Sequence, residues 1–93
     1  MSYTIQYRAS VKRDMRRLDA ATARRVDAAI LALADLPRPP GCVKLSGTSG
    51  LWRIRVGTYR VVYKIRDKEL IVLVVSVAHR REVCRAATAG PAG

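Results

Sequence analysis

The chain has 93 residues, which is enough for one small domain and too few for a second hydrophobic core. Its 18 Lys and Arg residues outnumber its 7 Asp and Glu residues, and this balance favours a polyanionic partner such as RNA, DNA, the ribosome or an acidic protein. The longest apolar run is too short to span a bilayer and the first residues hold no signal peptide, so a cytoplasmic protein is expected. Two distant cysteines and one histidine do not form a metal-binding pattern, so we expect neither a metal nor another cofactor.

The first 37 residues predict a strand followed by a helical hairpin. Residues 3–7 alternate in polarity, as a short strand does. Ser10 is the expected N-cap of a first helix, and residues 19–22 are expected to separate it from a second helix that Pro37 stops. The helical spacing is carried by Val11, Met15 and Leu18, and then by Val26, Ala29, Ile30 and Leu33.

The second half of the chain predicts a loop and three strands. Residues 37–50 form the loop, with a brief extended piece at Lys44 and Leu45. The strands are expected over residues 51–56, 59–66 and 69–78, joined by turns at 57–58 and 67–68. Residues 80–87 predict a short helix, and residues 88–93 a disordered tail.

The fold class follows from this order of elements, which is β-αα-βββ with a short C-terminal helix. We expect an α+β fold in which the helical hairpin packs on an antiparallel-rich sheet. A single domain over residues 1–87 is expected, with residues 88–93 outside it.

The hairpin LWRIRVGTYRVVY sorts its side chains onto two faces. A two-residue turn at Gly57 and Thr58 places Arg55 opposite Arg60. The face toward the helices would hold Trp52, Ile54, Val56, Tyr59, Val61 and Tyr63, and the other face Arg53, Arg55, Arg60 and Lys64.

Like charges opposite one another weaken a sheet, so the basic face needs an explanation. One reading is a solvated sheet surface. The other is an anion site, because a phosphate held between the Arg55 and Arg60 guanidinium groups would relieve their repulsion. The residues expected to extend this site are Lys44, His79, Arg80 and Arg81.

The strings GLWRIRVGTYRVVYKI and LIVLVVSVAHRREV, together with PRPPG after the helices, resemble the RelE/ParE superfamily of bacterial type II toxins, and its RelE branch in particular. The resemblance spans residues 3–85. It implies a toxin that enters the ribosomal A site, cuts mRNA there without a metal and inhibits translation. It also implies a cognate antitoxin that wraps the toxin and covers its basic surface.

The resemblance also implies roles for individual residues. In RelE-type cleavage the 2′-OH of the RNA attacks the adjacent phosphate, which requires proton transfers and cations around the transition state. The resemblance assigns phosphate contact and charge stabilisation to Arg53, Arg55, Arg60 and Arg80. The first two stand at positions that are often lysine in the family.

The chain departs from the family pattern at Cys84, where many RelE toxins carry a tyrosine with an acid–base or base-stacking role. His79 is the nearby side chain suited to proton exchange near neutral pH, so we take it as the candidate for part of that transfer. Two alternatives remain: a ParE-like inhibitor of DNA gyrase, which shares the fold, and a degenerate toxin that acts only by binding its antitoxin.

Overall fold

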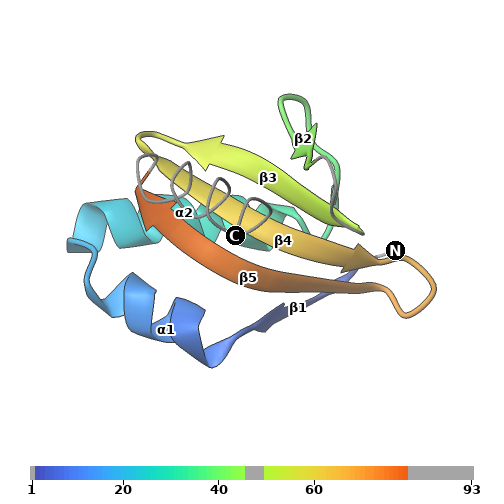
Figure 1. Ribbon diagram of the computed structural model, residues 1–93, viewed down its shortest axis with the longest axis horizontal. Coiled ribbons are helices and arrows are strands. Elements are labelled where there is room, and N and C mark those ends of the chain that lie inside the picture. The colour runs from blue at the N-terminus through green and yellow to red at the C-terminus, as the bar shows by residue number, and fades with distance from the viewer. Residues whose placement is uncertain (1, 46–49, 80–93) are drawn as a thin grey trace, which may run out of the picture.

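The computed structural model describes residues 2–45 and 50–79 as two helices and a five-stranded sheet, which confirms the expected α+β fold (Figure 1). The elements in chain order are β1 (Thr4–Tyr7), α1 (Ala9–Arg16), α2 (Ala20–Ala32), β2 (Val43–Lys44), β3 (Leu51–Val56), β4 (Tyr59–Arg66) and β5 (Ile71–His79). The helix expected over residues 80–87 and the tail expected over 88–93 lie outside the described residues.

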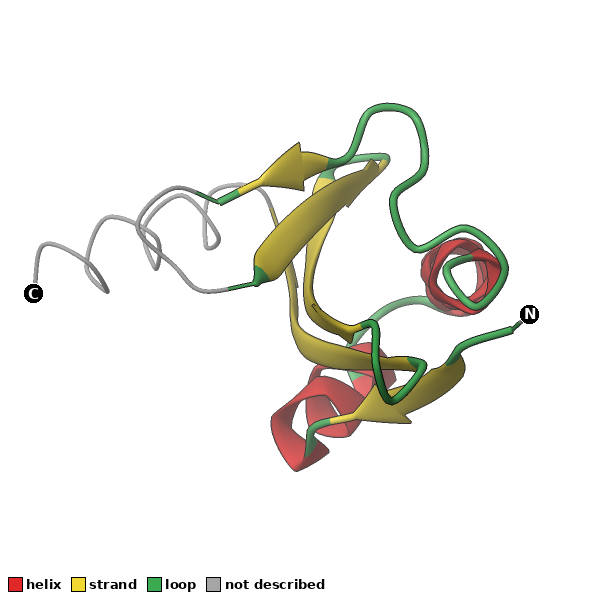
Figure 2. Cartoon of the chain, turned by 90° about the vertical axis from the view of Figure 1, so that its right-hand side faces the viewer, coloured by secondary structure: helices red, strands yellow, loops and turns green. Residues whose placement is uncertain are grey.

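The strands lie in the order β1-β5-β4-β3-β2, and the sheet is strongly curved (Figure 2). Only the β1–β5 pair is parallel, so the antiparallel-rich sheet expected from the sequence is confirmed. The β4–β5 register shifts after Val62, because Val62 pairs with Ser76 whereas Tyr63 pairs with Val74. This irregularity reverses the alternation of side chains along β5 at Val75.

Both helices pack on one face of the sheet, α1 against β5 and α2 against β3 and β4. The apolar residues expected on that face are there: Ile54, Val61 and Tyr63 are buried in the core, and Trp52, Val56 and Tyr59 pack against it. The helices contribute buried Val11, Val26, Ile30 and Leu33. None of the helices within the described residues is long and apolar enough to cross a membrane.

The expected N-cap of the first helix is wrong, because α1 begins at Ala9 and Ser10 lies inside its first turn. Arg8 occupies the N-cap position in an extended conformation, and its backbone N–H donates to the carbonyl of Val74 in β5. The chain therefore passes from β1 into α1 without a spacer, and no side chain caps the helix.

The expected break between the helices is confirmed, although it lies slightly earlier than residues 19–22. Asp19 is the N-cap of α2, and its carboxylate accepts bonds from the backbone N–H and the hydroxyl of Thr22. The helix ends at Ala32, before Pro37 is reached. Strong capping at Asp19 fixes the start of α2.

Four contacts tie the loop after α2 and Tyr3 to one end of the sheet. The guanidinium group of Arg38 binds the Asp67 carboxylate at 2.9 Å and lies over the ring of Trp52. The Tyr3 hydroxyl donates to the same carboxylate, and the buried Tyr63 hydroxyl donates to the carbonyl of Pro37 at 2.7 Å. Segments distant in sequence are thus joined at one end of the sheet.

Replacing Asp67 by asparagine is expected to lower the melting temperature at neutral pH and to have no effect in acid. Hydrogen bonds from Arg38 and then from Tyr3 hold the pKa of Asp67 below its usual 3.8. A group whose pKa is lower in the folded state stabilises the fold above its unfolded pKa, and this stabilisation disappears as the pH falls through the folded value. Thermal unfolding of both proteins from neutral pH down to strong acid tests the assignment. A difference in melting temperature that persists in strong acid would contradict it.

Candidate nucleic-acid interface

The turn between β3 and β4 sets the geometry of the basic surface. Gly57 has a φ of +61°, a conformation that glycine adopts without strain. Glycine with positive φ at the first position of a two-residue turn is typical of the type II′ hairpin. The resulting register pairs Arg55 directly with Arg60 and confirms the expected pairing.

Four cations in the paired part of β3 and β4 share the face of the sheet that points away from the helices, and Arg66 lies on the same face at the far end of β4. Arg53 pairs with Val62 and Lys64 pairs with Leu51, so their side chains lie on the same side as those of Arg55 and Arg60. We call Arg53, Arg55, Arg60 and Lys64 the arginine face. Arg55 is exposed, whereas the other three are partly buried.

Two residues expected to extend this surface lie on the other side of the sheet. Lys44 pairs with Trp52 and therefore shares the face that packs on the helices. His79 pairs with Tyr59, and the two rings meet edge-on with centroids 5.6 Å apart. The prediction that Lys44 and His79 join the arginines on one surface is therefore wrong.

The remaining predicted residues, Arg80 and Arg81, lie outside the described residues, as does Cys84. Within the part of the chain that the structure describes, no group of three or more His, Cys, Asp or Glu side chains is arranged to hold a metal ion. The structure therefore assembles four of the eight predicted site residues on one face.

The chemistry available on the arginine face is electrostatic. Guanidinium and ammonium groups bind phosphate oxygens through charge-assisted hydrogen bonds, and the planar guanidinium offers two parallel donors. The described residues on this face of β3, β4 and β5 include no carboxylate, imidazole or phenol. The arrangement suits binding of a phosphodiester and stabilisation of the negative charge that accumulates on it.

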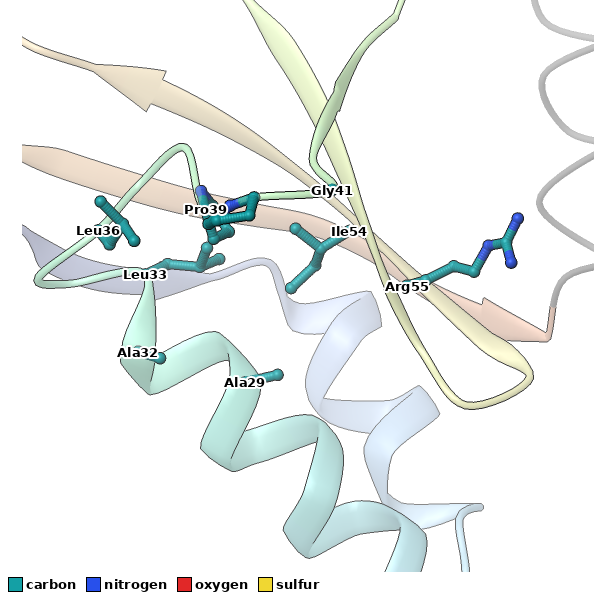
Figure 3. Close-up of a pocket in the computed structure, with 9 residues that line it drawn as sticks. Ala29, Ala32, Leu33, Leu36, Pro39, Gly41, Ile54 and Arg55 are labelled. Carbon is teal, nitrogen blue, oxygen red and sulfur yellow. The ribbon is translucent and has the colours of Figure 1, made fainter.

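A second surface feature, an apolar groove of about 330 Å³, was not anticipated from the sequence (Figure 3). It lies between the C-terminal end of α2, the loop after it and β3, where Ile54 points toward the groove and Arg55 points away. The exposed large apolar side chains among the described residues are Leu31, Leu36 and Val43. Of these three, Leu36 lines the groove, whereas Leu31 and Val43 do not.

Comparison with known proteins gives consistent matches over most of the chain. A family model described as the ParE toxin of the type II toxin-antitoxin system parDE matches residues 5–84. Toxin RelG of Mycobacterium tuberculosis is 32% identical over 90 residues, which are 91% of this chain and 99% of that protein. A putative RelE-like toxin protein of Escherichia coli is 29% identical over 86% of this chain and 85% of its own length.

Solved structures match the fold as well. RelE in the archaeal RelE–RelB complex of Pyrococcus horikoshii has a TM-score of 0.77 and 28% identity, covering 86% of this chain and 97% of that one. The toxin–antitoxin complex RelBE2 of Mycobacterium tuberculosis contains a chain with a TM-score of 0.76 and 26% identity, covering 85% and 99% respectively.

Proposed function

Because the chain belongs to the RelE/ParE superfamily of type II toxin–antitoxin toxins, we propose that it is a ribosome-dependent endonuclease that cuts mRNA in the A site and thereby inhibits translation. The observation that carries this proposal is the pairing of Arg55 with Arg60, with Arg53 and Lys64 on the same face. A bound phosphodiester explains the opposed guanidinium groups better than a solvated surface does, because the phosphate offsets their repulsion.

In the proposed reaction the 2′-oxygen of one nucleotide attacks the adjacent phosphorus. A bond forms between them as the bond to the 5′-oxygen of the next nucleotide breaks, which leaves a 2′,3′-cyclic phosphate and a 5′-hydroxyl. Water takes the proton of the 2′-OH and supplies one to the departing 5′-oxygen, since the described residues of the arginine face include no carboxylate, imidazole or phenol. Arg53, Arg55 and Arg60 stabilise the added negative charge on the phosphate, and Lys64 contacts the neighbouring backbone. The ribosome orients the mRNA and places this activity in the cytoplasm.

The role once expected for His79 receives no support from its position on the Tyr59 side of the sheet. We therefore expect His79→Gln to cleave ribosome-bound mRNA at close to the wild-type rate. Single-turnover cleavage by the two proteins measures this directly. A large loss of activity with an unchanged melting temperature would return His79 to the mechanism.

A ParE-like inhibitor of DNA gyrase is the second candidate, and the family model that matches the chain is the observation in its favour. A gyrase inhibitor would damage DNA on induction without cutting mRNA. A degenerate toxin would do neither and would retain only antitoxin binding. Induction of the chain, followed by primer extension on cellular mRNA, distinguishes the three, and cuts within codons are the result expected here.

The proposed protein partner is a cognate antitoxin. RelE is in complex with RelB in the Pyrococcus horikoshii structure, and RelBE2 is likewise a toxin–antitoxin complex. An acidic protein would complement the net charge of +11. A small acidic protein encoded beside this chain and copurifying with it would support this assignment.

A further inference from the structure

The outer side of α1 carries a second concentration of positive charge, separate from the arginine face. Its exposed cations are Arg8, Lys12, Arg13, Arg16 and Arg17, which we call the α1 basic face. The apolar residues of the same segment point the other way, since Val11 is fully buried and Met15 packs against the core. The solvent side of α1 is thus almost entirely cationic.

The two basic surfaces lie on opposite sides of the sheet. The arginine face points away from the helices, whereas α1 packs on the opposite face, against β5. The outer side of α1 therefore points away from the sheet altogether, and one phosphate cannot contact both surfaces.

An ordinary solvated helix face mixes charges of both signs, and α1 does not. Lys12 and Arg16 lie one helical turn apart, as do Arg13 and Arg17, so like charges repel along the helix. Asp14 is the only acidic residue between positions 8 and 18. The ion pairs among the described residues are Arg38–Asp67 and Arg66–Glu69, and neither involves α1. The α1 helix has only eight residues and no side-chain cap, so the repulsion among its cations weakens an already short helix. A cost to stability of this kind indicates a binding role for the cations.

The composition of the α1 basic face identifies the kind of partner. Protein interfaces have an apolar centre with few charges, and this face has no exposed large apolar side chain among its described residues. Single-stranded nucleic acid is usually bound with aromatic platforms for the bases, and positions 8–18 contain no aromatic residue. Lysine and arginine repeated along a rigid helix suit a fixed array of phosphates, as in base-paired RNA.

We infer that the α1 basic face binds the phosphate backbone of structured, base-paired RNA, independently of the RNA strand held by the arginine face. The inference rests on the proposed function in that both surfaces then act on one RNA-containing target. The chain would lie between the single strand to be cut and an adjacent RNA helix, and the second contact would add affinity without adding a catalytic group.

The test uses the full chain with Lys12→Gln and Arg16→Gln together, since glutamine is neutral and has a helix propensity similar to that of lysine and arginine. Binding to an RNA duplex is measured by fluorescence anisotropy over a range of salt concentrations. We expect the slope of log affinity against log salt to become shallower by about 2, roughly 1 for each lost phosphate contact. The melting temperature and the affinity for a short single-stranded RNA should stay as in wild type.

The matched control is Arg66→Gln with Lys68→Gln, which removes the same charge at the β4–β5 end of the sheet. An equal loss of slope in the control would show a general charge effect and overturn the inference. Unchanged duplex binding by the α1 variant would also overturn the inference. This holds as well if the variant instead loses affinity for an acidic antitoxin. Because duplex binding does not involve cleavage, failure of the proposed nuclease activity would leave this result interpretable.

Discussion

Replacing Arg60 by alanine is expected to lower the rate of ribosome-dependent mRNA cleavage by about 100-fold or more, the usual effect of removing one preorganised group that stabilises transition-state charge. Arg60 lies directly opposite Arg55, and its side chain points away from the helical core. The free energy of unfolding should therefore change little. Primer extension on ribosome-bound mRNA measures the rate, and denaturant unfolding measures the stability.

Arg66→Ala is the matched control, because Arg66 is an arginine at the far end of the same strand, exposed to solvent and weakly paired with Glu69. It should cut at the wild-type rate. Wild-type cleavage by Arg60→Ala would remove this residue from the mechanism. Unfolding of Arg60→Ala would instead show that the arginine face has been assigned to the wrong side of the sheet.

Replacing Ile30 by alanine is expected to destabilise the fold by about 2–5 kcal/mol, the range seen when a large aliphatic side chain is removed from a closed core. Ile30 is fully buried between α2 and the sheet, in the cluster that includes Val61 and Tyr63. A loss of this size would lower the melting temperature by roughly 10 °C or more. Denaturant and thermal unfolding monitored by circular dichroism provide the measurement.

Leu31→Ala, one position further along α2, separates burial from residue type. Leu31 is 53% exposed, so its truncation should change the free energy of unfolding by no more than about 0.5 kcal/mol. Similar losses for the two variants would mean that the helix is not packed on the sheet as described.

The central hairpin could be predicted from the sequence because several local signals agree there. Gly57 and Thr58 fix a two-residue turn, and polar and apolar residues alternate on both sides of it. The bounds of β3 and β4 and the pairing of Arg55 with Arg60 therefore match the structure. The helix break at Asp19 was similarly marked by a good capping residue.

The positions of Lys44 and His79 could not be read in the same way. Residues 70–75 are all apolar, so the sequence does not show which side of β5 faces the helices. The register shift at Val62 then reverses the alternation before His79 is reached. Lys44 lies in a strand of two residues inside a long loop, and its register is set by β3 rather than by any local pattern.

The most direct test of the account is the salt dependence with which a short single-stranded RNA binds the wild type and a variant carrying Arg53→Gln, Arg55→Gln and Arg60→Gln. If the three guanidinium groups contact phosphates together, the slope of log affinity against log salt should become shallower by about 2, since each contact on a single strand contributes roughly 0.7. A folded variant whose slope equals that of the wild type would contradict the claim that these strands form the RNA-binding site.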